Sequence, residues 1–552
     1  MESNKKYLQI HPLDNVMVAL QNLPKGTSIE WKGSGFRLAC DISAKHKFTI
    51  QKMQAGQEIY MYGVLVGKAT RDIEAGSLIN IDNTSHAAGD FKLGKRKINW
   101  EKPDVSGFSK KVFMGFHRQN GTVGTANYWI VVPMVFCENR NIEVLKEALT
   151  EKLGFKRAGS YEAEVENLVE LFRAGKSAEE ILDVDLQSGM YETRPKKIFE
   201  NIDGIKFLSH TMGCGGTRMD SDALCGLIAG YITHPNVAGA TILSLGCQHA
   251  QTNILTNEVN KRDPFFNKPL IILEQQKIGT EREMLCEALK RTFTGLMEAN
   301  KLTRQPAHLS KLCIGLECGG SDGFSGISAN PVLGYVSDML VSLGGSVILS
   351  EFPELCGVEQ ELSDRCVDEE TALKFIGLMS RYNALAEAGG SGFYANPSPG
   401  NIKDGLITDA IKSAGAAKKG GSSPVTDVLD YPQKITKPGL NLLCTPGNDV
   451  ESATAEVASG ANIVLFTTGL GTPTGNPVAP VIKISSNTEL FIKMPDIIDI
   501  NCGTIIGGQE TIRAAAERIL DFVIQVASGE IQPKAVLNEQ EDFIPWKRGV
   551  SL

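Results

Sequence analysis

The sequence of 552 residues lacks the features that mark membrane, secreted and nucleic-acid-binding proteins. No segment reaches the roughly 18–20 apolar residues that a transmembrane helix needs, and residues 1–15 contain no apolar core of the signal-peptide kind. Acidic residues outnumber basic ones by 64 to 56, giving a net charge of −8. No global positive field therefore draws the chain to nucleic acid or to an anionic membrane. We expect a cytoplasmic protein that binds neither.

Two common nucleotide-binding patterns are also missing. The sequence has no G-x-x-x-x-G-K-S/T phosphate loop and no G-x-G-x-x-G that opens a helix after a strand. The glycine-rich stretch 469–475 (GLGTPTG) contains a proline and no lysine. Nucleotide binding is therefore not expected, and an anionic ligand would have to be held by a local site.

The N-terminal region contains a weak internal repeat. Gly26, Gly56 and Gly76 each precede an isoleucine by three residues, and each is followed by a short strand-like run. Glycine turns between short strands are typical of a compact β domain, in which these isoleucines would share a small core. We predict an all-β domain over residues 1–92, followed by a polar linker over 93–110.

From residue 111 the pattern changes to alternating strands and helices. The nearly continuous apolar run 129–135 predicts a buried parallel strand. The helix expected after it has leucine and isoleucine on one face between residues 142 and 153, and Gly154 is placed to end it. We predict two α/β domains with mainly parallel sheets, over residues 111–255 and 256–552.

The loops after these apolar runs are rich in Gly, Cys, His, Asn and acidic residues. Ligands of open α/β sheets bind beyond the carboxyl ends of the strands, so these loops predict a site. Cys214, Cys247 and Cys318 each follow such a run, and thiolates bind iron or zinc well. The twelve cysteines lie in a chain expected to keep its thiols reduced. The three thiols are candidate metal ligands, but their spacing matches no local metal motif, so three small residues in tight turns is the alternative.

Three side chains are candidates for proton transfer. Histidine is scarce, with eight in the chain, and His210 lies in a glycine-rich strand-end loop. His46 lies in the β domain, where a structural role is the alternative. Lys419 lies in the stretch 415–424 (GAAKKGGSSP), whose composition predicts a disordered insert or a mobile loop that closes over a ligand. A solvated lysine is the alternative there.

Long glycine-rich segments carry a resemblance over nearly the whole chain. They include FLSHTMGC at 207–214, LECGGSDGFSGISANPVLG at 316–334, GLNLLCTPGND at 439–449 and LFTTGLGTPTGNPVAPVIKISSN at 465–487. At these segments the sequence resembles the altronate and galactarate dehydratase family. The resemblance implies an N-terminal domain of the SAF (β-clip) type and the removal of water from a hexonate to give a 2-keto-3-deoxy acid.

The substrate implied first is D-altronate, which would give 2-keto-3-deoxy-D-gluconate in galacturonate breakdown. A dehydratase or lyase of another acid, such as galactarate or sulfolactate, is one alternative. A non-catalytic sugar-acid-binding protein is another. We also expect a homo-oligomer.

The resemblance also implies a divalent metal, Fe²⁺ first with Mn²⁺ as an alternative, while a labile iron–sulfur cluster on the three thiols stays open. The sequence departs from the family pattern at Asn80 and Asp82, where relatives carry histidines, and at Ala126, where they carry arginine. These departures bear on the metal site and on substrate choice. The positions matched to substrate-binding residues are Glu317, Asp322, Asn396, Asn401, Asn448 and Asp449.

Overall fold

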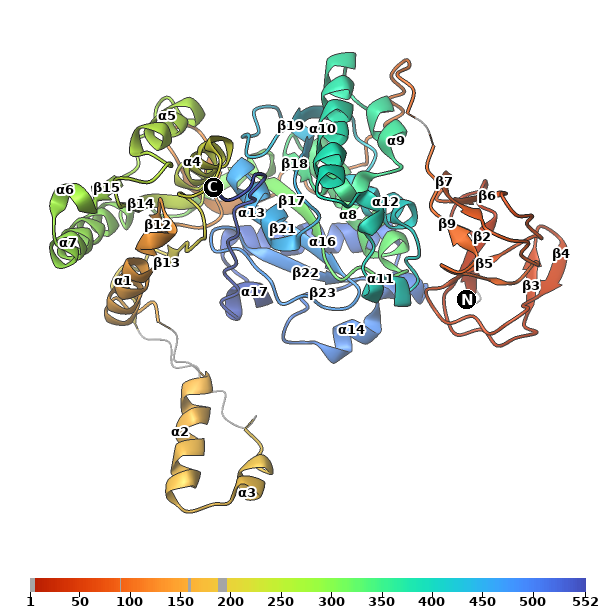
Figure 1. Ribbon diagram of the computed structural model, residues 1–552, viewed down its shortest axis with the longest axis horizontal. Coiled ribbons are helices and arrows are strands. Elements are labelled where there is room, and N and C mark those ends of the chain that lie inside the picture. Colours follow the sequence, from red (N-terminus) through yellow and green to blue (C-terminus); the bar gives the residue numbers. More distant parts are fainter. Residues whose placement is uncertain (1–4, 90, 157–159, 187–195) are drawn as a thin grey trace.

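The computed structural model describes residues 5–89, 91–156, 160–186 and 196–552. A β-rich domain lies at one end of the molecule, a large α/β body lies in the centre, and a smaller α/β domain lies at the other end (Figure 1). Among the described residues, no helix is both long and apolar enough to cross a membrane. The predicted fold class, an all-β domain followed by α/β domains with parallel sheets, is confirmed.

The N-terminal domain is built from short antiparallel strands. The predicted turn glycines Gly26, Gly56 and Gly76 have φ of +80°, +84° and +76°, a conformation that glycine adopts at little cost. The strands form sheets β1-β2-β5-β8, β3-β4 and β6-β7-β9. Their bounds are β1 Tyr7–Leu8, β2 Val16–Ala19, β3 Ser28–Trp31, β4 Ser34–Arg37, β5 Lys47–Thr49, β6 Glu58–Met61, β7 Val64–Ala69, β8 Leu78–Ile79 and β9 Thr84–Ser85.

The prediction that the isoleucines of the repeat share one core is wrong. Ile29 packs in a small cluster with Phe48, inside the N-terminal domain. Ile59 and Ile79 belong instead to a large cluster that continues into the C-terminal domain. The reason is that one face of the β domain is buried against the body, so its apolar residues divide between two cores.

The second domain is a four-stranded parallel sheet with helices on both faces. The strand order is β13-β12-β14-β15, with β12 Tyr128–Pro133, β13 Gly204–Phe207, β14 Val237–Ser244 and β15 Leu270–Glu274. Its helices are α1 Asn139–Lys152, α4 Arg218–Thr233, α5 Thr252–Arg262, α6 Gln275–Ile278 and α7 Glu281–Ala299. Helix α1 buries Ile142, Leu145 and Leu149, as its periodicity predicted. Because β15 pairs with β14 and α7 packs on it, we place the end of this domain near residue 300 rather than at 255.

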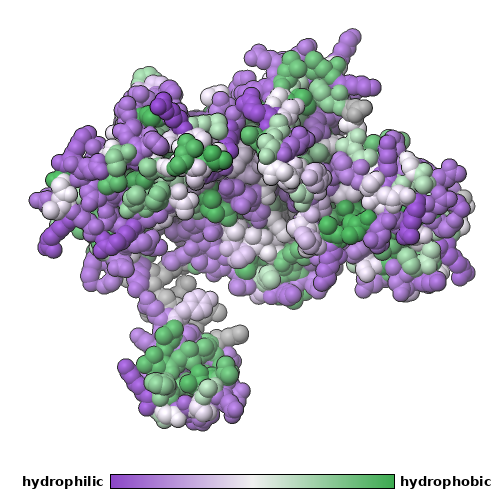
Figure 2. Space-filling view, viewed as in Figure 1, coloured by the Kyte–Doolittle hydropathy of each residue, from purple (hydrophilic) through white to green (hydrophobic). Residues whose placement is uncertain are grey.

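Helices α2 (Ser160–Arg173) and α3 (Ala178–Leu182) project from the second domain, away from the body (Figure 1). The space-filling view shows an apolar surface on this projection (Figure 2). Tyr161, Phe172 and Leu182 are among its exposed residues.

The C-terminal domain carries a seven-stranded parallel sheet in the order β19-β20-β18-β17-β21-β22-β23. From β17 the chain adds β18, then β19 at the edge and β20 between β18 and β19, and it then returns to the other side of β17, which makes a topological switch between β17 and β21. The strands are β17 Cys313–Cys318, β18 Ser346–Leu349, β19 Val425–Leu429, β20 Gly439–Leu443, β21 Ile463–Thr468, β22 Val481–Ser485 and β23 Ile500–Asn501.

Helices cover both faces of this sheet, and a small antiparallel sheet joins the domains. The helices are α8 Ala329–Ser342, α9 Glu359–Asp364, α10 Glu369–Ala388, α11 Pro399–Lys403, α12 Asp409–Ala416, α13 Asp449–Ser459, α14 Thr488–Lys493, α15 Gly503–Ile506, α16 Ile512–Ser528 and α17 Lys534–Leu537. The small sheet is formed by β10 Val112–His117, β11 Val123–Gly124 and β16 Gln305–His308.

The prediction for the stretch 415–424 is wrong, because this segment is an ordered part of the core. It contains the end of α12 and the short 3-10 helix η6 (Ala417–Gly420), and Lys419 is buried. A Cβ at Gly334 of α8 would lie 2.2 Å from the Lys418 carbonyl oxygen. The small residues therefore allow close packing of η6 on α8.

Candidate active site

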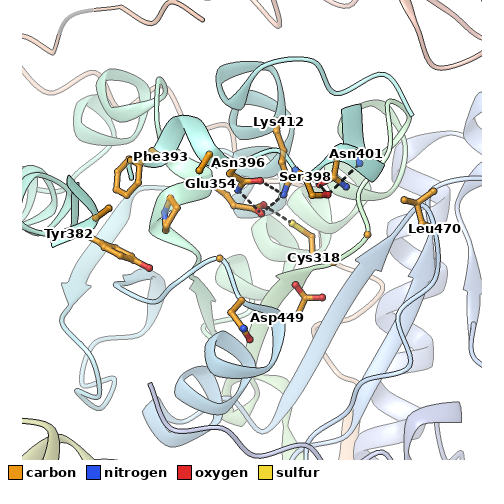
Figure 3. Close-up of a pocket in the computed structure, with 18 residues that line it drawn as sticks. Cys318, Glu354, Tyr382, Phe393, Asn396, Ser398, Asn401, Lys412, Asp449 and Leu470 are labelled. Carbon is orange, nitrogen blue, oxygen red and sulfur yellow. Dashed lines mark hydrogen bonds and ion pairs between the residues drawn. The ribbon is translucent and has the colours of Figure 1, made fainter. Parts of the chain in front are cut away.

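A cavity of about 590 Å³ opens at the carboxyl end of the seven-stranded sheet. Cys318 and Gly319 bring the end of β17 to it, and Asn448 and Asp449 bring the start of α13 (Figure 3). Gly320 joins the loops on the two sides of the topological switch, because its carbonyl accepts from the backbone N–H groups of Gly469 and Leu470. The cavity therefore lies where the strand-end loops predicted a ligand site.

A buried cluster of charged groups forms the floor of this cavity. Cys318 Sγ lies 3.4 Å from Glu351 Oε2 and 3.2 Å from Glu354 Oε2. The Lys419 ammonium lies 2.8 Å from Cys318 Sγ and 2.6 Å from Glu351 Oε2. Lys412 Nζ lies 2.6 Å from Glu354 Oε1. Two cations thus face two carboxylates and a thiol, and all five side chains are largely removed from water.

The electrostatics divide these groups into proton holders and anions. Burial opposes the charge of Lys419, but the neighbouring Cys318 and Glu351 dominate and raise the pKa of Lys419 well above its usual value. Burial also opposes ionisation of Glu354, yet Lys412 and Lys419 hold the pKa of Glu354 below its usual value. Burial raises the pKa of the Cys318 thiol well above its usual value. In this arrangement both lysines are charged and Glu354 is an anion.

A second layer of carboxyl groups lies behind the cavity. Burial, with Glu351 and Glu456 beside it, raises the pKa of Glu317 well above its usual value. Burial raises the pKa of Glu456 to about 8. One oxygen each of Glu317, Glu351 and Glu456 accepts no hydrogen bond from a donor group, and the carboxyl groups of Glu317 and Glu351 interact with each other. Such buried acceptors have capacity left for a cation or for a proton.

These residues could hold a divalent metal. Donor atoms of Cys318, Glu351 and Glu354 lie within 4.8 Å of one another. A thiol with carboxylates is a donor set that suits a borderline-soft ion such as Fe²⁺. The free oxygen of Glu351 adds an acceptor to this set. The donors therefore fit a metal, which would compete with the Lys419 ammonium for Cys318 and Glu351.

Asp449 is the cavity-lining acid with a pKa near neutrality. Burial, followed by the charges of Glu351 and Glu354, raises the pKa of Asp449 to about 7. Space beside it is limited, because a Cβ at Gly319 would lie 1.9 Å from Asp449 Oδ2. A carboxyl group with such a pKa can take up or release a proton near pH 7.

We expect the Asp449→Asn variant to be as stable as wild type near pH 4 and more stable near pH 8. Folded Asp449 keeps its proton up to about pH 7, whereas the unfolded group loses it near its usual 3.8. Wild-type stability therefore falls as pH rises through this window, and the asparagine variant lacks that loss. Urea midpoints measured from pH 4 to 8 check this. A difference that stays constant across the range would contradict the shifted pKa.

The predicted asparagines line the cavity, but their contacts are mainly structural. Asn448 caps α13, accepting from the backbone N–H groups of Val450 and Glu451 at 3.2 Å each. Asn401 caps α11 together with Ser398, and its amide donates to the Ser321 carbonyl at 2.7 Å. Asn396 is the exception, because its carbonyl oxygen accepts from Lys412 Nζ at 2.9 Å and so touches the charged cluster.

Asp322 does not line the cavity and instead joins domains. Its carboxylate is fully buried and accepts from Ser486 Oγ at 2.7 Å and from Asn487 Nδ2 at 3.1 Å. Lys45, from the N-terminal domain, reaches it with Nζ 3.1 Å from Oδ2. Lys47 donates to the Gly405 carbonyl at 2.7 Å. Two lysines of the β domain thus insert into the body beside the cavity.

The two predicted catalytic histidines lie outside this cavity. His46 is in the N-terminal domain, with Nδ1 3.2 Å from the Ala44 carbonyl. His210 is buried in the second domain, where Nε2 lies 2.7 Å from the Pro133 carbonyl and Nδ1 accepts from Met212 N–H at 3.1 Å. Burial lowers the pKa of His210 to about 4, so the ring is neutral. Catalytic roles for these two residues stay predictions.

The three predicted metal thiols do not meet. Cys214 and Cys247 are exposed at the ends of β13 and β14, while Cys318 is buried at the end of β17 in another sheet. In the part of the chain that the structure describes, Cys318 is grouped instead with Glu351 and Glu354. The expectation of three converging thiols is therefore wrong, because equivalent strand ends of two different sheets need not be neighbours. The iron–sulfur alternative loses the residue set on which it depended.

Three residues of the cluster were not singled out as site residues from the sequence: Glu351, Glu354 and Lys412. Glu351 lies two residues after the last residue of β18 and has φ +61°, an uncommon conformation for glutamate. Its position after an apolar run was a usable signal. Glu354 lies in the 3-10 helix η4 (Phe352–Leu355) and Lys412 lies in α12, and neither position follows a strand. No local pattern identifies these two.

Three family profiles match consecutive parts of the chain. The altronate/galactarate dehydratase SAF domain matches residues 5–87, the D-galactarate dehydratase/altronate hydrolase second domain matches 115–300, and the D-galactarate/altronate dehydratase C-terminal domain matches 309–551.

Full-length relatives are similar along the whole chain. An altronate dehydratase of Bacillus subtilis (strain 168) is 34% identical over 99% of this chain and 100% of the relative. An altronate dehydratase of Escherichia coli (strain K12) is 33% identical over the same shares. A galactarate dehydratase (L-threo-forming) of Escherichia coli (strain K12) is 31% identical over 95% of this chain and 93% of the relative.

Proposed function

The chain belongs to the D-galactarate/altronate dehydratase family, and from this premise we propose that it removes water from D-altronate to give 2-keto-3-deoxy-D-gluconate. The family makes the protein a hydro-lyase of sugar acids. Altronate is favoured because the two altronate dehydratases match at 33–34% identity over their whole length. We further propose that the protein acts in the cytoplasm as a homo-oligomer.

The observation that carries the proposal is the charged floor of the cavity. A cavity of about 590 Å³ is large enough for a six-carbon acid. The overall charge of −8 repels an anion, so its binding needs local cations. Lys412 lines the cavity, and its side chain is 11% exposed. We propose that the Lys412 ammonium binds the substrate carboxylate while remaining paired with Glu354.

Dehydration of an aldonate begins with loss of the weakly acidic proton at C2. The negative charge that develops on the carboxylate must be stabilised, and the Lys412 ammonium is placed to do so in a site with little water. Asp449, with its pKa near 7, is the group proposed to take up that proton. The hydroxyl at C3 leaves as water when it receives the proton that Asp449 took from C2, and the enol formed tautomerises to the 2-keto acid.

Lys419 is proposed as a positioning residue rather than as a base. Its ammonium lies behind Cys318 and Glu351 and holds its proton, so it cannot accept another. Its charge offsets the buried acids and fixes the floor of the cavity. Cys318, Glu351 and Glu354 would hold the divalent metal, proposed to be Fe²⁺, which when bound supplies Lewis-acid stabilisation of the developing enediolate.

We expect anaerobic protein supplied with Fe²⁺ to form a 2-keto acid from D-altronate, with galactarate and sulfolactate as parallel substrates. A keto-acid assay measures the product, and replacement of Fe²⁺ by Mn²⁺ tests the metal. Product from galactarate alone would move the substrate assignment to that acid. Binding of altronate without product in metal-replete protein would favour a sugar-acid-binding protein.

A further inference from the structure

Three side chains with different donor atoms meet where the N-terminal domain touches the body. His86 follows β9 directly, Cys356 follows η4 directly, and Asp409 is the first residue of α12. The His86 Nδ1 and Asp409 Oδ1 atoms are in contact, and donor atoms of all three residues lie within 4.8 Å of one another. We propose that these residues form a second divalent-metal site, of the zinc-binding kind, which clamps the N-terminal domain to the C-terminal domain.

The donor chemistry suits Zn²⁺. Imidazole, thiolate and carboxylate are its usual protein ligands, and tetrahedral ligands about 2.0–2.3 Å from the ion lie roughly 3.3–3.8 Å apart. For the group to hold an ion, its widest donor separation must contract slightly, and the His86–Asp409 contact must open to admit the ion. Glu359 lies close enough that its charge acts on both His86 and Asp409. Two carboxylates and a thiol facing one imidazole leave an acidic excess, which a dication would neutralise.

The backbone around this group is closely packed. Gly357, the residue after Cys356, has φ +90°, and a Cβ there would lie 3.3 Å from Ala88 Cβ and 3.4 Å from Ala410 Cβ. The three segments that supply the donors are thus in van der Waals contact. Gly357 N–H also donates to Glu359 Oε2 at 2.7 Å, which holds this carboxylate beside the group. The His86 side chain is 36% exposed, so an ion can enter from solvent.

The proposed metal site shares two segments with the Glu354–Lys412 ion pair of the cavity, one around η4 and the other in α12. Glu354 precedes Cys356 by two residues in sequence, and Lys412 follows Asp409 by three, about one turn along α12. An ion bound by Cys356 and Asp409 would therefore fix these segments relative to each other from outside the cavity. The inference itself depends only on the donor group and not on the proposed reaction.

The test uses the full chain, stripped with chelator and titrated with Co²⁺ alone, because cobalt bound to a thiolate gives a charge-transfer absorption. In the Cys318→Ser background, which removes the thiol of the cavity, the band should persist; adding Cys356→Ser should abolish it, and adding the exposed-cysteine control Cys286→Ser should keep it. His86→Ala should bind at least about 100-fold more weakly, since loss of even an outer partner of a metal ligand costs 10–100-fold.

A second readout covers variants that fold poorly. Zn²⁺ should raise the melting temperature of Cys318→Ser and of Cys318→Ser/Cys286→Ser, and should raise that of Cys318→Ser/Cys356→Ser by less. No cobalt–thiolate band in Cys318→Ser, or a band that Cys318→Ser/Cys356→Ser retains, would overturn the proposal and leave an interdomain ion pair only. A band present in wild type but lost in Cys318→Ser would assign the ion to the cavity and also overturn it.

Discussion

The Lys412→Met variant is expected to lose activity by about 10²–10³-fold in kcat/KM while remaining folded. Its Nζ lies 2.6 Å from Glu354 Oε1 and lines the cavity, and truncating one partner of a buried charge pair costs about 2–5 kcal/mol. Methionine keeps most of the length of the side chain and removes the ammonium, with its charge and its hydrogen bonds to Glu354 and Asn396. Steady-state kinetics with the substrate identified by the keto-acid assay give the measurement.

A pH profile separates this electrostatic role from a general structural one. Lys412 is the charge that does most to hold the pKa of Glu354 below its usual value, so its loss should raise that pKa. The acid limb of kcat/KM should then move to higher pH in the variant. Lys418→Met is the matched control, since Lys418 is one-third exposed and pairs with Glu361 at 3.6 Å. Equal losses in both variants would refute a specific role for Lys412.

The Asp322→Asn variant is expected to lose about 3–5 kcal/mol of stability and to loosen the N-terminal domain. Removing one partner of a buried ion pair leaves the other charge uncompensated. In the variant, an amide NH₂ group at the position of Oδ2 would also face two other hydrogen-bond donors, the Lys45 ammonium and the Asn487 amide. The first unfolding transition in urea should move to lower concentration, and the segment 93–110 should be cut faster by protease.

Asp404→Asn provides the comparison for this variant. Asp404 also pairs with Lys45 at 3.1 Å, but its side chain is 27% exposed, so water can replace part of the interaction. We expect a loss of roughly 1 kcal/mol or less for this variant. If Asp404→Asn were as unstable as Asp322→Asn, the buried hub at Asp322 would not be what holds the domain.

The sequence predicted the location of the cavity because the carboxyl ends of parallel strands share one edge. Cys318, Asn448 and Asp449 follow β17 and β20, two strands of the same sheet. Period and composition are local properties, and they were sufficient to find strands and the turns after them. The helix α1, with its end at Gly154, was found in the same way.

The same reasoning could not say which strand ends are neighbours. Cys214 and Cys318 look equivalent in sequence, yet Cys214 lies in the loop after β13 and Cys318 ends β17, a strand of a separate sheet. His210 had the composition of a site around it, but its ring is tied to backbone groups on both nitrogens. The Lys412–Glu354 pair joins a helix to a 3-10 helix and is fixed by tertiary packing alone.

Glycine residues have different structural roles in two places where the sequence is rich in them. Gly26 marks a turn with positive φ, as predicted. Near Lys419 the glycines allow η6 to pack closely on α8, whereas the composition of this stretch predicts a mobile loop. Composition alone does not separate these uses, because both follow from the absence of a Cβ.

The insertion of Lys45 and Lys47 into the body has a consequence for synthesis on the ribosome. The acceptor of Lys47, the Gly405 carbonyl, lies 358 residues later in the chain. At translation rates of about 5–20 residues per second, roughly 20–70 s pass between the two. Throughout that time the nascent N-terminal domain must keep its fold without its docking surface. Its lysines then serve as solvent-facing charges that discourage aggregation, before the completed body buries them.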